Sequence, residues 1–314
     1  MHMQTLTVVV PAYNESEGLR DFHARLAKVL DGLDLESEVL YVDDGSRDDT
    51  YAIMCALRDA DPRVSTLKLA RNFGKELALT AGLDHVNADA AIVIDADLQD
   101  PPELIPTFVQ HWRDGYDVVY GTRASRAGET PFKKATASAF YRVMERLSQT
   151  PIPRDTGDFR LLSRRALDAL KQVRERQRFM KGLFTWVGYR QLSVVYHRDP
   201  RHAGETKWNY WRLWNFAIDG ITSFSGAPLK LATYVGLATA VVAFVFGIWV
   251  LGKALLFGDP VRGYPSLMVV VLLLGGVQLV ALGVIGEYLG RLYVESKQRP
   301  LYLVDEYHPP HGGG

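Results

Sequence analysis

Aspartates follow two short apolar runs: Asp44 comes after Glu38–Val42, and the pair Asp95 and Asp97 comes after Ala91–Ile94. Carboxylate oxygens suit Mg²⁺ or Mn²⁺, and such an ion can bridge a diphosphate and neutralise its charge as it leaves. Each motif alone has an ordinary alternative, because Asp is common in strand-end turns and at helix N-caps. Together, at the ends of separate strands, the motifs favour a metal site for a phosphorylated ligand.

Apolar runs alternate with amphipathic segments over the first 120 residues, and this pattern predicts the scaffold beneath the aspartates. We expect strands at Thr5–Pro11, Glu38–Val42, Val64–Leu69, Ala91–Ile94 and Asp117–Tyr120, with helices between them. Such alternation implies right-handed crossovers and a mostly parallel sheet, so the fold class is α/β. Ligands in these sheets bind beyond the carboxyl ends of the strands, where the aspartates lie.

Three motifs together resemble the glycosyltransferase family 2 enzymes, which have the GT-A nucleotide-sugar-binding fold: Pro11–Glu15, Val42–Ser46 and Asp95–Asp97. The resemblance extends from about Thr5 to Trp208. It implies that the donor is bound by Pro11, Tyr13, Glu15, Asp44, Asp95, Ala96 and Asp97. Within that set, Asp44 contacts the base or ribose, and Asp95 and Asp97 hold the metal and the diphosphate. The resemblance makes Asp97 the principal metal ligand and a catalytic residue.

Three further stretches resemble the polyprenyl-phosphate glycosyltransferases, a group that includes dolichol-phosphate mannose synthases and bactoprenol glucosyltransferases: Arg71–Lys75, Asp97–Glu103 and Asp155–Arg160. Arg198-x-x-Arg201 followed by Gly204–Trp208 also fits, although other members often have Ser at position 205 or 206. The resemblance implies inverting transfer of one hexose from a nucleotide-sugar to a polyprenyl (undecaprenyl) monophosphate. UDP-glucose is the first choice of donor, and GDP-mannose or a UDP-amino sugar remains open.

Asp158 is the second catalytic candidate, expected in a turn before a strand at Phe159–Leu162. The family places an Asp here as the base near the acceptor. A lipid monophosphate has a second pKa of about 6, so it is already largely an anionic nucleophile at neutral pH. Asp158 therefore either removes a proton, orients the acceptor or touches the metal; the alternative is a turn residue that caps local backbone.

Two anionic reactants require positive charge, and the basic candidates lie near the acidic edge or just before the apolar C-terminal part. We predict acceptor-phosphate binding by Arg123, Arg198, Arg201 and Lys207. The alternative for the last three is the ordinary enrichment of basic residues beside a membrane. Lys75 opens a predicted helix, where a positive charge is unfavourable unless an anion is near, so we assign it to the donor phosphates.

Two runs without a charged residue, Leu231–Leu251 and Leu267–Gly286, are each long enough to cross a hydrocarbon layer of ~30 Å. Their basic flanks predict a two-helix hairpin in the inner (cytoplasmic) membrane, with the catalytic domain and both termini cytoplasmic. Aromatic residues at helical spacing before the first run predict an interfacial helix. Small residues such as Gly236 and Gly275 would permit homo-oligomer formation through the membrane helices.

The predicted organisation has five parts. They are a cytoplasmic GT-A catalytic domain at 1–207, an interfacial amphipathic helix at 208–228, transmembrane helices at 229–257 and 264–290, and a cytoplasmic tail at 291–314 that is loose from His308 onward. No signal peptide is expected at the start of the chain. The single cysteine, Cys55, excludes an intrachain disulfide, and 36 basic residues balance 36 acidic ones, which excludes a global charge that would attract nucleic acid.

The sequence bears on three other classes of protein. A processive polysaccharide synthase would need a Gln-x-x-Arg-Trp motif, which the sequence lacks. A dehydrogenase is excluded because no G-x-G-x-x-G follows the first strand. A catalytically inactive membrane adaptor or lipid transporter remains the alternative from another class, and the full set of aspartates argues against it.

Overall fold

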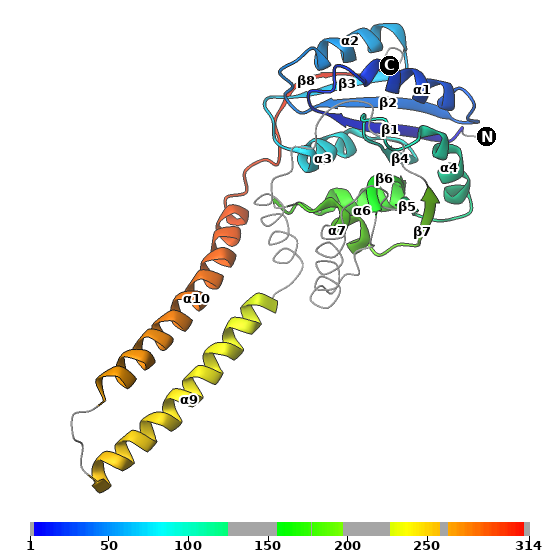
Figure 1. Ribbon diagram of the computed structural model, residues 1–314. Coiled ribbons are helices and arrows are strands. Elements are labelled where there is room, and N and C mark those ends of the chain that lie inside the picture. The colour runs from blue at the N-terminus through cyan, green and yellow to red at the C-terminus, as the bar shows by residue number, and fades with distance from the viewer. Residues whose placement is uncertain (1–2, 125–155, 177, 197–226, 258–262, 311–314) are drawn as a thin grey trace.

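The computed structural model describes residues 3–124, 156–176, 178–196, 227–257 and 263–310. These residues form a sheet with helices on both faces and a helical hairpin that projects away from it (Figure 1). The predicted interfacial helix at 208–228 falls largely outside the described residues, as do Arg198, Arg201 and Lys207. Those assignments remain predictions.

The sheet has eight strands in the described residues, in the order β7-β5-β6-β4-β1-β2-β3-β8. Their bounds are Thr5–Ala12 (β1), Glu36–Asp43 (β2), Val64–Leu69 (β3), Ala90–Val93 (β4), Val118–Arg123 (β5), Thr156–Ser163 (β6), Gln191–Tyr196 (β7) and Val304–His308 (β8). Strands β6 and β8 run antiparallel to their neighbours, and the other pairings are parallel. The α/β, mostly parallel architecture expected from the sequence is confirmed.

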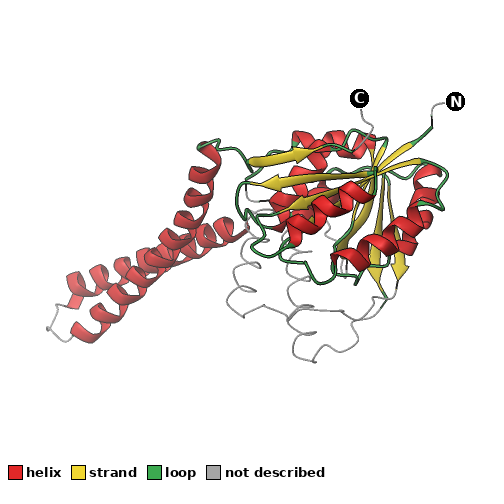
Figure 2. Cartoon of the chain, turned by 90° about the horizontal axis from the view of Figure 1, so that it is seen from above, coloured by secondary structure: helices red, strands yellow, loops and turns green. Residues whose placement is uncertain are grey.

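Helices cover both faces of the sheet, which is therefore the middle of three layers (Figure 2). One face carries α1 (Leu19–Leu30), α2 (Thr50–Ala60), the short 3₁₀ helix η1 (Pro102–Leu104) and α4 (Ile105–Arg113). The other face carries α3 (Lys75–His85), α6 (Arg164–Gln172) and α7 (Met180–Trp186). Strands buried on both faces read as continuous apolar runs, which is why β1 and β4 were recognisable in the sequence.

Helix α3 lies unusually close to the sheet because Gly82 faces β1 and β2. A Cβ atom at Gly82 would lie 2.4 Å from Val9 Cγ1 and 2.9 Å from Val42 Cγ2. Any larger residue would push the helix outward at the cost of packing contacts on both strands. The close approach fixes the first residue of α3, Lys75, at the carboxyl edge of the sheet.

The C-terminal segment joins the catalytic domain, which the sequence analysis does not anticipate. Strand β8 pairs antiparallel with β3, and the Ala70 N–H donates to the Leu303 carbonyl at 2.9 Å. Lys68 lies 3.1 Å from an Asp305 carboxylate oxygen and 3.3 Å from one of Glu306. His308, expected to be loose, is the last residue of this strand.

The hairpin consists of α9 (Ala227–Phe257) and α10 (Tyr264–Ser296), which pack along each other (Figure 1). In the described residues, one stretch is long and apolar enough to cross a membrane, Leu273–Ser296, and none of it is buried within the protein. Helix α9 contributes a shorter apolar stretch, Ala232–Phe246. The second membrane span remains a prediction.

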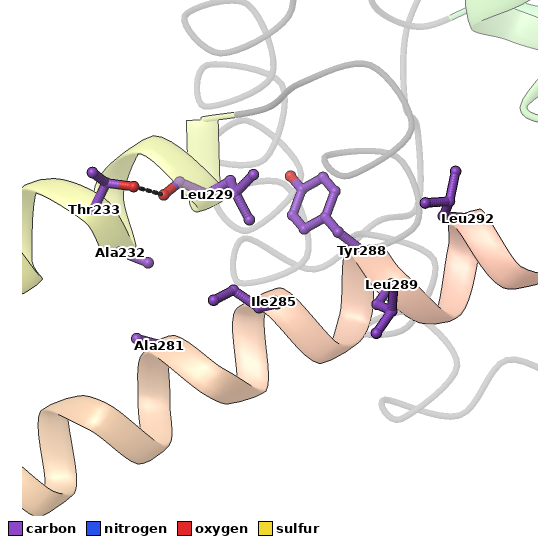
Figure 3. A pocket seen from close by; sticks show the side chains of 8 residues that line it. All are labelled: Leu229, Ala232, Thr233, Ala281, Ile285, Tyr288, Leu289 and Leu292. Carbon is purple, nitrogen blue, oxygen red and sulfur yellow. Dashed lines mark hydrogen bonds between the residues drawn. The ribbon is translucent and has the colours of Figure 1, made fainter.

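An apolar groove of about 450 Å³ lies between the two helices at the end nearer the catalytic domain (Figure 3). The ring of Tyr288 projects from α10 toward the start of α9. The Thr233 hydroxyl donates to the Leu229 carbonyl of its own helix at 3.0 Å, so it offers little polarity to the groove. The groove differs from the acidic edge of the sheet because aliphatic side chains provide most of its lining.

Candidate active site

The loops that follow β1 and β2 are fastened to each other at the carboxyl edge of the sheet. The Asn14 N–H donates to Ser46 Oγ at 3.0 Å, and the Arg47 N–H donates to Asn14 Oδ1 at 2.9 Å. The Glu15 N–H donates to Thr50 Oγ1 at 2.9 Å. These bonds fix the backbone around Tyr13, whose side chain is exposed, and its predicted contact with the nucleotide stays a prediction. Pro11, predicted beside it, is buried in β1.

Asp44 is buried and holds the loop that follows β3. One of its carboxylate oxygens accepts from the Phe73 N–H at 2.7 Å and the other from the Gly74 N–H at 2.9 Å. Burial raises the pKa of Asp44, and these two hydrogen bonds oppose that increase. The structure thus gives Asp44 a role in shaping the Arg71–Lys75 loop, and its predicted contact with the nucleoside stays a prediction.

Gly45 permits the same loop to approach. Its φ of +69° lies in the left-handed region, and a Cβ atom there would lie 2.6 Å from both Arg71 C and Asn72 N. Both observations exclude a side chain at this position. The Asp-Asp-Gly motif therefore positions the Arg71–Lys75 loop, and with it Lys75, at the edge of the sheet.

Lys75 bridges Asp158, a predicted catalytic residue, and Asp95, a predicted metal and donor ligand. Its Nζ lies 2.6 Å from Asp95 Oδ2 and 2.6 Å from Asp158 Oδ2. Burial alone would raise the pKa of Asp158, but the charges of Lys75, Lys181 and Arg160 hold it below its usual range. Burial would likewise lower the pKa of Lys75, and the two carboxylates raise it instead. Lys75 and Asp158 are therefore both charged at neutral pH, whereas burial raises the pKa of Asp95.

One local expectation is wrong, and the assignment of Lys75 to the donor phosphates stays a prediction. Asp158 was expected in a turn, yet β6 begins at Thr156 and contains it, because pairing with β4 and β5 extends the strand beyond its apolar part. Lys75 was assigned to donor phosphates on account of its unfavourable place at a helix start. The anions that it contacts in the structure are the carboxylates of Asp95 and Asp158.

Asp97 lies in a turn beyond the end of β4. The strand ends at Val93, so Asp95 and Asp97 both lie beyond it and strand alternation does not set the directions of their side chains. Leu98 adopts a left-handed φ of 60°, and the Gln99 N–H donates to Asp97 Oδ1 at 3.2 Å. Ala96 is buried between the two aspartates, which are both half-buried.

The carboxylates suit a cation that is shared with a substrate. Asp95 and Asp158 converge on one positive centre, and Asp158 Oδ1 is buried without a hydrogen-bond partner in the described residues. Among those residues, no three His, Cys, Asp or Glu side chains form a group that could hold a metal ion. Mg²⁺ is commonly held by one or two protein carboxylates together with substrate phosphates, and this donor set fits that arrangement.

Basic and aromatic groups border the carboxylates on the side of β5 and β7. Arg123 Nε is buried and has no hydrogen-bond partner in the described chain, and Arg123 Nη2 would lie 3.4 Å from a Cβ atom at Gly157. The buried Tyr196 hydroxyl donates to Asp100 Oδ1. Arg160 donates to the Gly157 carbonyl at 2.8 Å, and its guanidinium lies 3.8 Å from the centre of the Phe184 ring. Arg123 thus lies beside β6, the strand that contains Asp158, and its predicted contact with the acceptor phosphate stays a prediction.

Sequence reasoning missed several residues of this site. Asp100 and Arg160 lie inside motifs that were recognised, so their spacing from Asp97 and Asp158 was an available signal. No such sequence signal marks Glu76, Lys181 or Tyr196. Their proximity to Asp158 depends on how α3, α7 and β7 pack.

Comparison with known proteins defines the class. Residues 7–171 match glycosyl transferase family 2, and residues 227–292 match the GtrB C-terminal hairpin. The chain belongs to glycosyltransferase family 2, and it carries this hairpin after the catalytic domain. The resemblance found in the sequence motifs is confirmed.

Relatives align with almost the whole chain. The chain is 52% identical over 301 residues to an uncharacterized glycosyltransferase of Synechocystis, covering 96% of this chain and 95% of the relative. It is 46% identical over 299 residues to a bactoprenol glucosyl transferase of Shigella phage SfV, covering 95% and 97%. A crystal structure of Mycobacterium tuberculosis glucosyl-3-phosphoglycerate synthase with Mn²⁺, UDP-glucose and phosphoglyceric acid aligns with 19% identity and a TM-score of 0.49, covering 70% of this chain and 79% of that one.

Proposed function

We propose that this glycosyltransferase moves one glucose from UDP-glucose to the phosphate of a polyprenyl (undecaprenyl) monophosphate. The reaction takes place at the cytoplasmic face of the membrane and gives polyprenyl-phosphate-glucose. The observation that carries the proposal is the convergence of Asp95 and Asp158 on one cationic centre at the carboxyl edge of the sheet. Identity of 46% over nearly the whole chain to a bactoprenol glucosyl transferase supports the choice of sugar and lipid.

The donor lies across the carboxyl ends of β1, β2 and β4. Tyr13 and Glu15 border the nucleoside, and Asp95, Asp97 and Asp158 would hold a Mg²⁺ or Mn²⁺ ion together with the diphosphate. When bound, that ion offsets the negative charge that develops on UDP as it leaves. Lys75 lies at the same centre and adds a fixed positive charge toward the leaving group.

Transfer is a single displacement. An oxygen of the lipid phosphate forms the new bond to glucose C1 from the side opposite UDP, and the C1–O bond to UDP breaks with its electron pair going to the diphosphate. The configuration at C1 is therefore inverted. Asp158, with its low pKa, is a weak base toward a phosphate whose second pKa is about 6, so it orients the acceptor rather than deprotonating it.

The membrane part brings the lipid to this site. In the proposal, α9 and α10 both cross the membrane, and the catalytic domain and both termini are cytoplasmic. The long isoprenoid then stays in the bilayer while its phosphate reaches Arg123, Arg198, Arg201 and Lys207. The helices pair with those of further copies through small residues such as Gly275.

The test is a donor and acceptor screen with the purified full chain in lipid nanodiscs. Undecaprenyl phosphate is offered with UDP-glucose, GDP-mannose and UDP-N-acetylglucosamine, and both the lipid product and the released nucleotide are followed. The proposal predicts a glucosyl lipid and an equal amount of UDP. Release of no nucleotide from any donor, with or without the lipid, would instead support an inactive adaptor or lipid transporter.

A further inference from the structure

Helices α3 and α7 bring two lysines to the same side of Asp158. The Met180 N–H donates to Glu76 Oε2 at 3.0 Å, which joins the first turn of α7 to the first turn of α3. Lys75 directly precedes Glu76 in the sequence, and Lys181 directly follows Met180. The contact uses the backbone of Met180, so the position of α7 does not depend on the Lys181 side chain.

Lys181 differs from Lys75 and Arg160 in the contacts that its charged group makes within the described residues. Lys75 contacts two carboxylates, and Arg160 donates to two carbonyls and stacks on Phe184. The Lys181 ammonium makes no hydrogen bond or ion pair in the part of the chain that the structure describes. It is half-buried, and burial lowers its pKa.

A second donor faces the same place. Arg123 is the last residue of β5, and its Nη2 would lie 3.4 Å from a Cβ atom at Gly157, the residue before Asp158. The charge of Arg123 also lowers the pKa of Lys181, whereas that of Asp158 raises it. Arg123 Nε is buried without a hydrogen-bond partner in the described residues. The same Cβ atom at Gly157 would lie 3.7 Å from Asp100 Oδ2, so the glycine lets both groups approach β6 closely.

Buried cations without a counter-ion are destabilising unless an anion completes the site. The adjacent carboxylates are already shared with Lys75 or with Tyr196. A phosphate offers several acceptor oxygens, and it suits both a lysine point charge and an arginine fork. The unused donors of Lys181 and Arg123 therefore match a phosphate group beside Asp158.

We propose that Lys181 binds the phosphate of the polyprenyl phosphate acceptor, opposite Arg123 and next to Asp158. This inference rests on the proposed function, since it names a further residue for the acceptor of the same reaction. Lys181 holds the phosphate so that one oxygen faces glucose C1. The donor diphosphate is assigned to the centre that Lys75 shares with Asp95 and Asp158.

The first experiment compares Lys181→Met with the wild type in steady-state transfer by the full chain. We expect the KM for undecaprenyl phosphate to rise about tenfold or more, because a charged hydrogen bond is lost, and the KM for UDP-glucose to stay within about twofold. Lys181→Arg should restore most of the acceptor affinity. Lys28→Met, an exposed lysine on α1, is the matched control and should leave both constants unchanged. A rise in the KM for UDP-glucose alone would place Lys181 at the donor and overturn the inference.

The second experiment measures binding without turnover, so it remains informative if the wild type transfers no glucose. Farnesyl phosphate and inorganic phosphate are titrated into the wild type, Lys181→Met and Lys181→Gln, with thermal melting as a check on folding. Weaker binding of both ligands by the folded variants locates the contact at the phosphate group, as proposed. Unchanged affinity for farnesyl phosphate, or weakening for farnesyl phosphate with inorganic phosphate unaffected, contradicts it. If the wild type transfers no glucose but the variants still bind both phosphate ligands more weakly, the proposed function is contradicted and the phosphate site is supported.

Discussion

Replacing Lys75 with Met tests the electrostatic centre of the site. The substitution keeps an unbranched side chain and removes the ammonium that lies 2.6 Å from Asp95 and from Asp158. The two carboxylates then face each other without a positive charge between them. Breaking a buried ion pair costs about 3–5 kcal/mol, and an exposed pair contributes about 0–1 kcal/mol.

The expected magnitude follows from the exposure of the three groups. The Lys75 side chain is 44% exposed, and those of Asp95 and Asp158 are 20% and 12% exposed. Water screens the lysine more than the carboxylates, so we expect a loss of about 1.5–3 kcal/mol in the free energy of unfolding. For a domain of this size, that corresponds to a fall in Tm of roughly 3–12 °C.

The assay is thermal melting of the full chain in detergent, in EDTA and in excess Mg²⁺. Lys75→Met should melt below the wild type in EDTA, and Mg²⁺ should reduce the difference because it neutralises the same carboxylates. In the Lys75→Met background, Asp95→Asn should raise the Tm, since it removes the repulsion between the two carboxylates. In the wild type, the same substitution should lower the Tm. Equal melting of Lys75→Met and wild type in EDTA, or no reversal of sign, would refute the reasoning.

Three further outcomes are expected. Burial and the charge of Asp158 raise the pKa of Glu76 from 4.5 to about 7; the folded state therefore holds the proton more tightly, and stability falls as pH rises through 7. Melting curves should give Glu76→Gln a free energy of unfolding about 1–3 kcal/mol above that of the wild type at pH 8. This difference should shrink toward pH 5, and a difference that stays constant with pH contradicts the prediction. Gly45→Ala should displace the Arg71–Lys75 loop and lower transfer at least about tenfold in the glucosyl-lipid assay, since the new Cβ meets backbone 2.6 Å away; full activity would disprove the close approach. Removing residues 303–314 should expose the edge of β3 and increase aggregation in light scattering, and a monodisperse, active product would show that β8 is dispensable.

The central strands were predictable from the sequence because they are buried on both faces and therefore read as apolar runs. This held for β1 and β4. Strand β8 was missed because its five residues include Asp305 and Glu306, and its pairing with β3 depends on a chain segment far away in sequence. The start of β6 was misjudged for the same reason, since Thr156 to Asp158 reads as a turn without its neighbours.

The site was predictable in its parts and not in its contacts. Strand-end aspartates mark the edge where a ligand binds, and the sequence placed Asp95 and Asp97 there. The anomaly of Lys75 at a helix start was also visible, but its contact with Asp158 was not, because Asp158 reaches it only through the pairing of β6 with β4. Lys181 and Glu76 were invisible, since no periodicity encodes the contact between the first turns of α3 and α7.

The most direct measurement is glucose transfer to undecaprenyl phosphate by the full chain, with the divalent cation controlled and Asp97→Ala beside the wild type. The account predicts a glucosyl lipid from the wild type in Mg²⁺ or Mn²⁺, none in EDTA, and none from an Asp97→Ala protein that melts as the wild type does. Sustained transfer in EDTA, or wild-type turnover by Asp97→Ala, would contradict it.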